Sequence, residues 1–350
     1  MATNLYTMQS NMPMTAFKRE SLVAGKLCND YDFSGAKTVR ILTPVTVAMN
    51  NYERTGVNRY GTPAEMQDLI QDLTLTQDRS FALTIDKGND ADQNFAKNAG
   101  KMLMLQITER AVPEFDTYVL NKLAAKAGFA VGNSEPLTKE NVCDRISEAT
   151  AKLDDKEVPA YDRMLFVSTD TYRLLKHSEE FMAVQELGRD ALTKGVVGQY
   201  DNMEVIKVPA PRWPANVNFM IVHKNSATAP VKISETKLHK DPPGISGHLL
   251  EGREYYDCFV FGPRAYGVYA EINTASGKGS VAATPEISSA GALTSATSDA
   301  VIYYTTDGSD PRYSETAVQG NSVSAVAGTV VKAYAHKDGM FDSAVAEKTL

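Results

Sequence analysis

Apolar residues recur at helical spacing almost without interruption from residue 90 to residue 127. Asn89 can cap the first turn, and the two aspartates that follow it suit the positive end of the helix dipole. Pro113 interrupts the apolar stripe and predicts either a kink or the start of a second helix, and Gly128 predicts the end. At about 1.5 Å per residue, a continuous helix here would be roughly 57 Å long. The pattern therefore predicts a helical spine longer than one compact domain needs.

Strand-like patterns precede this helix. Residues 39–47 form an apolar run in which Pro44 cannot donate a ladder hydrogen bond, which indicates an edge strand or a two-stranded ribbon. Further on, Phe81 and Leu83 belong to an alternation of apolar and small or polar residues. We predict that residues 38–88 form an extended β-hairpin with a polar tip. Because a two-stranded ribbon is marginal alone in water, we expect its apolar face to lie on another surface, such as a neighbouring subunit.

The remaining chain divides into an arm, a mixed middle and a tail. Residues 1–37 are expected to form an extended N-terminal arm with a short helix. The middle combines short apolar strands with helices, one of them at 179–187, and is α+β in character. Residues 274–284 are small or polar and predict a flexible linker. Residues 285–350 alternate short strands with turns and carry a net acidic charge, which predicts a small all-β domain.

Composition changes this picture little. The chain of 350 residues is 43% hydrophobic and 23% charged, which is typical of a globular protein with two or three domains. Its net charge of −7 argues against charge-driven nucleic-acid binding by the surface as a whole. Three widely spaced cysteines predict neither a disulfide framework nor a zinc site. No secretory signal pattern and no apolar run near 18 residues is seen, so we expect a protein made in a cytosol, without a membrane partner.

No catalytic constellation emerges from the sequence. The five histidines match no metal-ligand or protease spacing, and there is no glycine-rich phosphate loop. Asp154 with Asp155, and Glu179 with Glu180, are adjacent pairs whose side chains point apart, unlike the facing carboxylates of a glycosidase. The turn at 307–310 lacks the spaced ligands of a calcium loop. We therefore expect no catalytic residue, no cofactor and no metal site.

Five residues of the predicted hairpin are candidates for contacts between subunits. Arg54, Arg59 and Tyr60 lie near its tip, and Phe81 and Leu83 lie on its apolar face. Exposed arginines at the end of a reaching arm can pair with carboxylates of an adjacent subunit, or they can serve solubility alone. The sequence leaves both interpretations open.

Five motifs between residues 30 and 128 closely resemble major capsid proteins of tailed bacteriophages. They are NYERTG at 51–56, RYGTP at 59–63, TQDRSF at 76–81, TIDKGN at 84–89 and PEFDTY at 113–118. The resemblance covers most of the first 272 residues and implies the Hong Kong 97-like fold. That fold would consist of an arm (1–37), a hairpin that reaches over a neighbour (38–88), a peripheral domain with the spine helix (89–137 and 225–273) and an axial domain (138–224).

This resemblance implies a structural protein and not an enzyme. Its copies would assemble as hexamers and pentamers into an icosahedral shell around double-stranded DNA, held without sequence specificity. A scaffolding protein would act during assembly, and a portal would occupy one vertex. Assembly would take place in the cytoplasm of the bacterial host, and the finished protein would lie in the virion. The nearer alternative is an encapsulin-type compartment shell with protein cargo.

The tail carries a second resemblance. Its sequence IYYTTDGSDP at 302–311 is similar to the immunoglobulin-like module at the C-terminus of chitobiases and many bacterial surface enzymes. The resemblance implies a small sandwich that faces outward from a capsid and binds host or environmental glycans weakly. Because a linker joins it to the body, we also expect it to be dispensable for assembly. Tyr303, Tyr304 and Tyr313 could stack on sugar rings, although strand alternation places about half of such side chains in a core.

Taken alone, the tail favours a different alternative, a secreted carbohydrate-binding or glycosidase-associated protein. That alternative predicts a signal peptide and a catalytic pair of carboxylates, and the sequence shows neither pattern.

Overall fold

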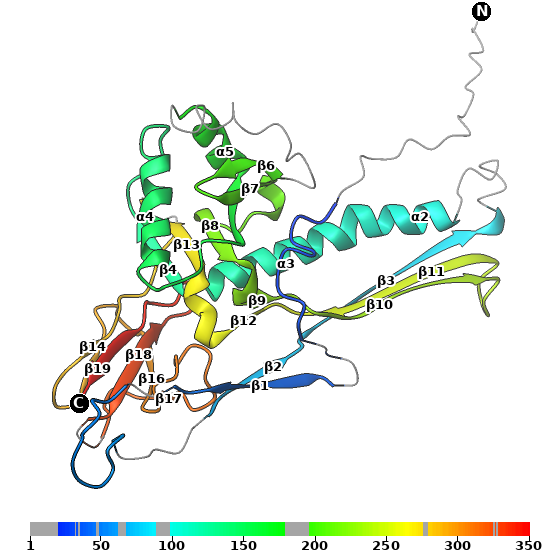
Figure 1. Ribbon diagram of the computed structural model, residues 1–350. Helices are drawn as coiled ribbons and strands as arrows, with labels where there is room; N and C mark the ends of the chain where they lie inside the picture. Colours follow the sequence, from blue (N-terminus) through cyan, green and yellow to red (C-terminus); the bar gives the residue numbers. More distant parts are fainter. Residues whose placement is uncertain are drawn as a thin grey trace, which may run out of the picture.

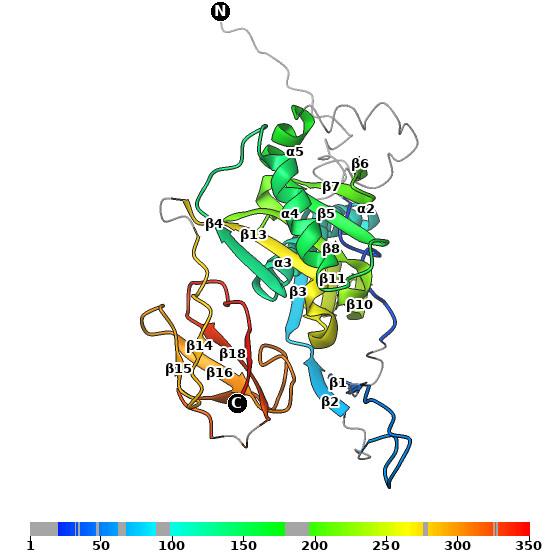
Figure 2. The same ribbon diagram turned by 60° about the vertical axis from the view of Figure 1, so that its left-hand side comes forward.

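The computed structural model describes residues 20–31, 33, 36–46, 49–61, 68–88, 99–178, 196–275, 279–324, 326 and 328–350. Three sequence-based expectations fall outside the described residues: the first 19 residues of the arm, the first turns of the spine helix at 89–98, and the helix at 179–187. The described chain forms an α+β body and an all-β C-terminal module (Figures 1 and 2). Among its helices, none is long and apolar enough to cross a membrane.

The spine helix is a rod of three consecutive segments, α2 (Ala99–Gln106), a π-helical turn (Ile107–Ala111) and α3 (Val112–Ala125). Pro113 stands in the first turn of α3, where its missing N–H removes one donor from the helical pattern. The π-helical turn accommodates this interruption, since the N–H of Val112 donates to the carbonyl five residues back. The predicted interruption is therefore a local widening of one rod (Figure 1).

The chain turns sharply where the spine helix gives way to β4 (Phe129–Asn133). Lys126 caps the helix, two residues before the glycine that we predicted as its end. Gly128 has another role, because a Cβ atom there would lie 2.1 Å from the carbonyl oxygen of Ala265. Glycine lets the two backbone segments approach this closely.

A six-stranded mixed sheet forms the centre of the body. Its strands, in spatial order, are β4, β13 (Val268–Asn273), β8 (Val217–His223), β5 (Arg163–Ser168), β7 (Met203–Val208) and β6 (Val196–Tyr200). One face packs on α4 (Val142–Asp154) and α5 (Thr169–Lys176), and the other packs on α3. Because side chains alternate along a strand, Phe166 packs toward α3 while Leu165 and Val167 pack toward α4. Both faces are buried, which explains the continuous apolar runs of these strands.

The region that we predicted as one hairpin over 38–88 contains parts of two sheets. One is β1 (Thr38–Pro44) with β2 (Asp68–Thr74), and the other is β3 (Gln77–Asp86), β11 (Gly247–Tyr256) and β10 (Val231–Lys240), in that order. β3 therefore does not return along β1, and its partner comes from much later in the chain. Alternation along a strand shows which face is apolar, but it does not name the strand that pairs with it.

Short elements join these parts at the base of the hairpin. They are a two-stranded pair of β9 (Ala227–Thr228) with β12 (Phe259–Val260), and 3₁₀ turns at Lys224–Ser226 and Gly262–Gly267. A third 3₁₀ turn, Ala210–Arg212, lies against the spine helix. A small apolar core of Phe33, Leu73, Leu75 and Phe261 fills the space beneath them. This core fixes the point from which the hairpin leaves the body.

The C-terminal module is a small all-β domain, as predicted. A four-stranded sheet has the order β17 (Val318–Gln319), β16 (Val301–Thr305), β18 (Val330–His336) and β19 (Ala346–Thr349), and β14 (Glu286–Ile287) pairs with β15 (Leu293–Thr294). Ile302, Val331 and Ala333 lie in its own apolar core. The N–H of Ala282 donates to the carbonyl of Phe341, so the end of the predicted linker already belongs to the module (Figure 2).

Candidate assembly surfaces

The loop that joins β1 to β2 extends beyond the body, and its main described part spans residues 49–61 (Figures 1 and 2). Its large apolar side chains are exposed: Met49 is 100% exposed, Val57 92% and Tyr60 86%. The loop has contacts of its own, since the rings of Tyr52 and Tyr60 meet edge to face at a centroid distance of 5.0 Å. Several large apolar side chains in water on one loop indicate a surface that a partner covers.

The two predicted arginines lie in this same loop, beside Tyr60. Both Arg54 and Arg59 are exposed, and Nε of Arg59 donates to the carbonyl of Gly56 at 3.3 Å. Within the described chain, neither guanidinium forms an ion pair with a carboxylate. The structure thus brings three of the five candidate residues together, and their contact with another subunit stays a prediction.

The stem of the hairpin has one covered face and one open face. On the covered face Leu73 is only 1% exposed. On the open face Leu42 and Ile70 stand opposite each other, 56% and 40% exposed. Beside them Arg40 donates two hydrogen bonds to Asp72, at 2.7 and 2.6 Å, and these hold the pKa of the Asp72 carboxyl below its usual value. The open face therefore offers an apolar pair next to an oriented ion pair.

Phe81 and Leu83, the other two candidates, lie on the three-stranded sheet. Their face also carries Tyr256, whose ring meets Phe115 of the spine helix at 5.2 Å. Phe81 lies over Gly252, where an added Cβ atom would be 2.3 Å from its ring. Leu83 is 40% exposed. These two side chains therefore lie on the helix side of the sheet and are only partly covered by their own subunit.

Asp257 is a buried junction that the sequence analysis missed. Its carboxylate, in a residue 1% exposed, accepts hydrogen bonds from the N–H and hydroxyl of Thr76, the hydroxyl of Tyr118 and the N–H of Cys258, at 2.7 to 2.9 Å. These donors come from the β2–β3 turn, the spine helix and the segment after β11. An aspartate inside an aromatic strand pattern was the available sequence signal.

Asp116 and Arg212 form a second buried junction outside the candidate list. Asp116 is fully buried and accepts from the hydroxyl of Ser21, the N–H of Leu22 and Nη1 of Arg212. Nη1 of Arg212 also donates to the carbonyl of Glu20. The pair therefore attaches the described end of the arm to the spine helix. An acidic residue on the apolar stripe of the helix could have indicated it.

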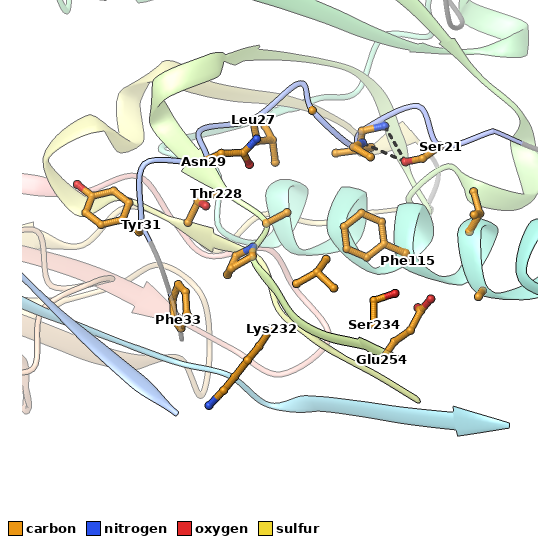
Figure 3. A pocket seen from close by; sticks show the side chains of 18 residues that line it. Ser21, Leu27, Asn29, Tyr31, Phe33, Phe115, Thr228, Lys232, Ser234 and Glu254 are labelled. Atoms are coloured by element: carbon orange, nitrogen blue, oxygen red, sulfur yellow. Dashed lines mark hydrogen bonds between the residues drawn. The ribbon is translucent and has the colours of Figure 1, made fainter. Parts of the chain in front are cut away.

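A cavity of about 490 Å³ lies between the arm, the start of α3 and β10 (Figure 3). Apolar groups such as Leu27, Tyr31 and Phe115 make up much of its wall, and Glu254 stands at one side. Burial, followed by repulsion from Glu114, raises the pKa of Glu254. Within the described residues, no group of three His, Cys, Asp or Glu side chains could hold a metal ion.

The three candidate tyrosines of the module have different surroundings. Tyr303 stacks on the ring of Tyr334 at 5.5 Å, and Tyr303 and Tyr304 are both partly exposed. Tyr313 faces the body instead, where its hydroxyl donates to the carbonyl of Lys126 at 2.6 Å and its ring packs against the main apolar core. Glycan contact stays a prediction for the first two, while the ring of Tyr313 is occupied by the body.

Known structures share the architecture of the body. A chain from Mycobacterium phage Che8 has a TM-score of 0.62 and 17% identity, over 78% of this chain and 99% of that chain. The asymmetric unit of the bacteriophage PhiM1 mature capsid has a TM-score of 0.60 and 14% identity, over 78% and 92%. The capsid of cyanophage P-SCSP1u has a TM-score of 0.61 and 12% identity, over 78% and 94%. The chain has a phage capsid fold.

The tail has a match of its own. Residues 282–347 match the family model of the chitobiase/beta-hexosaminidase C-terminal domain. No curated protein matches the chain. Both resemblances seen in the sequence are thus confirmed: a capsid fold followed by an immunoglobulin-like module. The exposed hairpin loop and the open stem are two surfaces of this fold on which the described chain leaves large apolar side chains uncovered.

Proposed function

We propose that this chain is the major capsid protein of a tailed bacteriophage. Its copies form hexamers and pentamers that close into an icosahedral shell around double-stranded DNA. The observation that carries the proposal is the exposed hairpin loop on a capsid fold, in which Met49, Val57 and Tyr60 remain in water unless a neighbouring subunit covers them. The role is structural, and no residue is assigned to catalysis.

Shell stability in this proposal is spread over many contacts. A fully buried Val or Met side chain contributes about 1.5–3 kcal/mol, which a single association event offsets through lost rotational and translational freedom. One loop on one neighbour is therefore a weak contact. A subunit that gives its loop to one neighbour and receives a loop from another is held far more tightly, because the second contact forms within an existing assembly.

The charge of the chain bears on what the shell encloses. A net charge of −7 favours a container that confines DNA by its walls more than by charge-driven binding. We further propose that the DNA is held without sequence specificity. We also propose a scaffolding protein during assembly and a portal at one vertex. Assembly takes place in the bacterial host cytoplasm, and the finished protein lies in the virion.

Imaging the purified chain tests this function. We expect closed shells, tubes or sheets in negative-stain micrographs and fast-sedimenting species in analytical ultracentrifugation. A monodisperse monomer at high concentration contradicts the proposal. DNA in particles from a native source supports a virus capsid, whereas a specific protein cargo points to the encapsulin-type alternative.

The double variant V57S/Y60S is expected to raise the concentration needed for assembly at least tenfold. Each lost apolar contact of about 1.4 kcal/mol corresponds to a factor of ten in an association constant. Light scattering against concentration measures the effect. The melting temperature of the unassembled subunit should change little, because both side chains are exposed and the ring contact of Tyr60 with Tyr52 lies within the same exposed loop. The matched control is V318S, since Val318 is 52% exposed in the module. If V57S/Y60S assembled at the same concentration as the wild type, this loop would not contribute a contact between subunits.

A further inference from the structure

The C-terminal module is attached to the body by more than its linker. Arg312 points out of the module, and its side chain is only 2% exposed. Its Nη1 donates to the carbonyls of Ala127 at 3.2 Å and Gly128 at 2.9 Å. The hydroxyl of Tyr313 donates to the carbonyl of Lys126 at 2.6 Å. Two adjacent module residues thus supply donors to three consecutive carbonyls where the spine helix ends.

Helix ends need such donors. The last carbonyls of a helix have no partner within the helix, and they carry the negative end of the helix dipole. The carbonyl of the capping residue Lys126 accepts from Tyr313, and the guanidinium of Arg312 bonds the two carbonyls just past the helix, where its charge lies near the negative end of the dipole. Arg312 is held in position by Asp310, whose two oxygens accept from Nε at 3.1 Å and Nη2 at 2.7 Å. The planar guanidinium fork therefore donates to Asp310 and to the carbonyls of Ala127 and Gly128 at the same time, which the single ammonium group of a lysine cannot do.

The same edge of the module also reaches the hairpin. Glu315 lies 3.8 Å from Arg40 of β1, which is already bonded to Asp72 of β2. A recess of about 210 Å³ lies between the module and the stem, with Leu69 of the hairpin on one side and Tyr313 on the other. The hairpin base, the helix end and the module therefore meet at one place.

Two further contacts strengthen this junction. Nζ of Lys126 lies 3.4 Å from the carboxylate of Asp342, which belongs to the module and is only 8% exposed. A Cβ atom added to Gly262 of the body would lie 3.1 Å from Cβ of Tyr313, so the glycine leaves room for this side chain. The two surfaces fit closely, as expected for a permanent contact and not for two domains on a flexible tether.

We propose that the module is an intramolecular clamp: Arg312 and Tyr313 fix it to the carboxyl end of the spine helix, and Glu315, together with the recess beside Leu69, holds it against the hairpin β1–β2. Its partner surface is the body of its own chain. The sequence-based expectation was an appendage on a flexible linker that is dispensable for assembly. The clamp acts within one subunit, so it does not depend on the proposed shell function.

Hydrogen–deuterium exchange on the full-length, unassembled chain tests the clamp. In R312A, which loses both bonds to the helix end, we expect the amides of β1 and β2 to exchange about tenfold faster. R312K should not restore protection, because an ammonium lacks the fork. R264A is the control and should exchange as wild type, since Arg264 is an exposed arginine on the neighbouring 3₁₀ turn whose side chain donates to the carbonyl of Asn225 and not to the module.

The amides of β16 and β18 show whether the module itself stays folded in R312A. If they remain protected while β1 and β2 exchange at the wild-type rate, the clamp is overturned. A second variant, E315K, places a positive charge near Arg40 on an exposed side chain that the module core does not use. It should speed exchange of β1 about two- to threefold, and an unchanged rate would exclude the contact with the hairpin. These experiments measure amide exchange within the unassembled subunit. They can therefore contradict the clamp without bearing on whether the chain forms shells.

Discussion

Replacing Asp257 with alanine is expected to lower the free energy of unfolding of the body by about 3–5 kcal/mol, since removing one partner of a buried charged network leaves the other groups without partners. In the wild type the carboxylate of Asp257 accepts four hydrogen bonds. In the variant the hydroxyl of the partly buried Tyr118 and the N–H of the buried Cys258 would lose this acceptor. Burial, followed by the bond to Asp257, already raises the pKa of Tyr118, so that phenol cannot respond by ionising near neutral pH.

Thermal unfolding of the unassembled chain measures this effect. For a body of this size, a loss of about 3–5 kcal/mol corresponds to a fall in melting temperature of roughly 6–15 °C. D257N should lose about half as much stability, because its amide keeps one acceptor oxygen and has an NH2 donor in place of the other. The control D78A removes a carboxylate that pairs with Arg253 on an exposed strand, and it should leave the melting temperature almost unchanged, because solvent screens this pair. Equal melting temperatures of D257A and D78A would show that the buried carboxylate of Asp257 does not stabilise the body.

Asp116→Ala is the second change with a large expected effect, about 3–5 kcal/mol, because it leaves the guanidinium of Arg212 buried without its carboxylate. It also removes the acceptor for Ser21 and Leu22. We therefore expect residues 20–28 to become accessible, which faster trypsin cleavage after Lys26 would report. The double variant D116A/R212A should be less destabilised than the sum of the two single variants, since the pair is lost together.

An exposed pair on the same helix is the matched control. Glu114 accepts from Arg79 at 2.6 Å, but both side chains are about half exposed. E114A should cost less than about 1 kcal/mol and leave cleavage after Lys26 unchanged. If D116A behaved like E114A, the arm would not be held by the buried pair.

Periodicity was enough to predict individual elements. The spine helix follows from apolar residues at helical spacing, since α3 buries Val119, Leu120 and Leu123 on one side. The all-β tail follows from short strands separated by turn residues such as those at 307–311. The exposed hairpin tip follows from a polar segment between two apolar runs. Each of these predictions needs only residues that are close in sequence.

Contacts between distant residues could not be predicted in this way. Three contacts join segments that are far apart in sequence: β3 pairs with β11, Asp257 accepts from Thr76, and Arg312 donates to Gly128. The last two residues are separated by 184 positions. Alternation shows which face of β3 is apolar, but it does not show which of several strands in the chain pairs with β3. The turn that carries Arg312 has the same local pattern whether or not a helix end lies against it.

The sequence by itself determined the class of the protein, through its capsid-like motifs, its helical spine and its immunoglobulin-like tail. Only the tertiary structure decided how these parts are joined: β3 leaves the hairpin for β11, Asp116 and Asp257 hold the arm and the hairpin base, and Arg312 ties the tail to the spine. The physical reason is that local patterns of polarity specify which surfaces must be buried, whereas the choice of partner depends on which distant donors and acceptors meet when the chain folds.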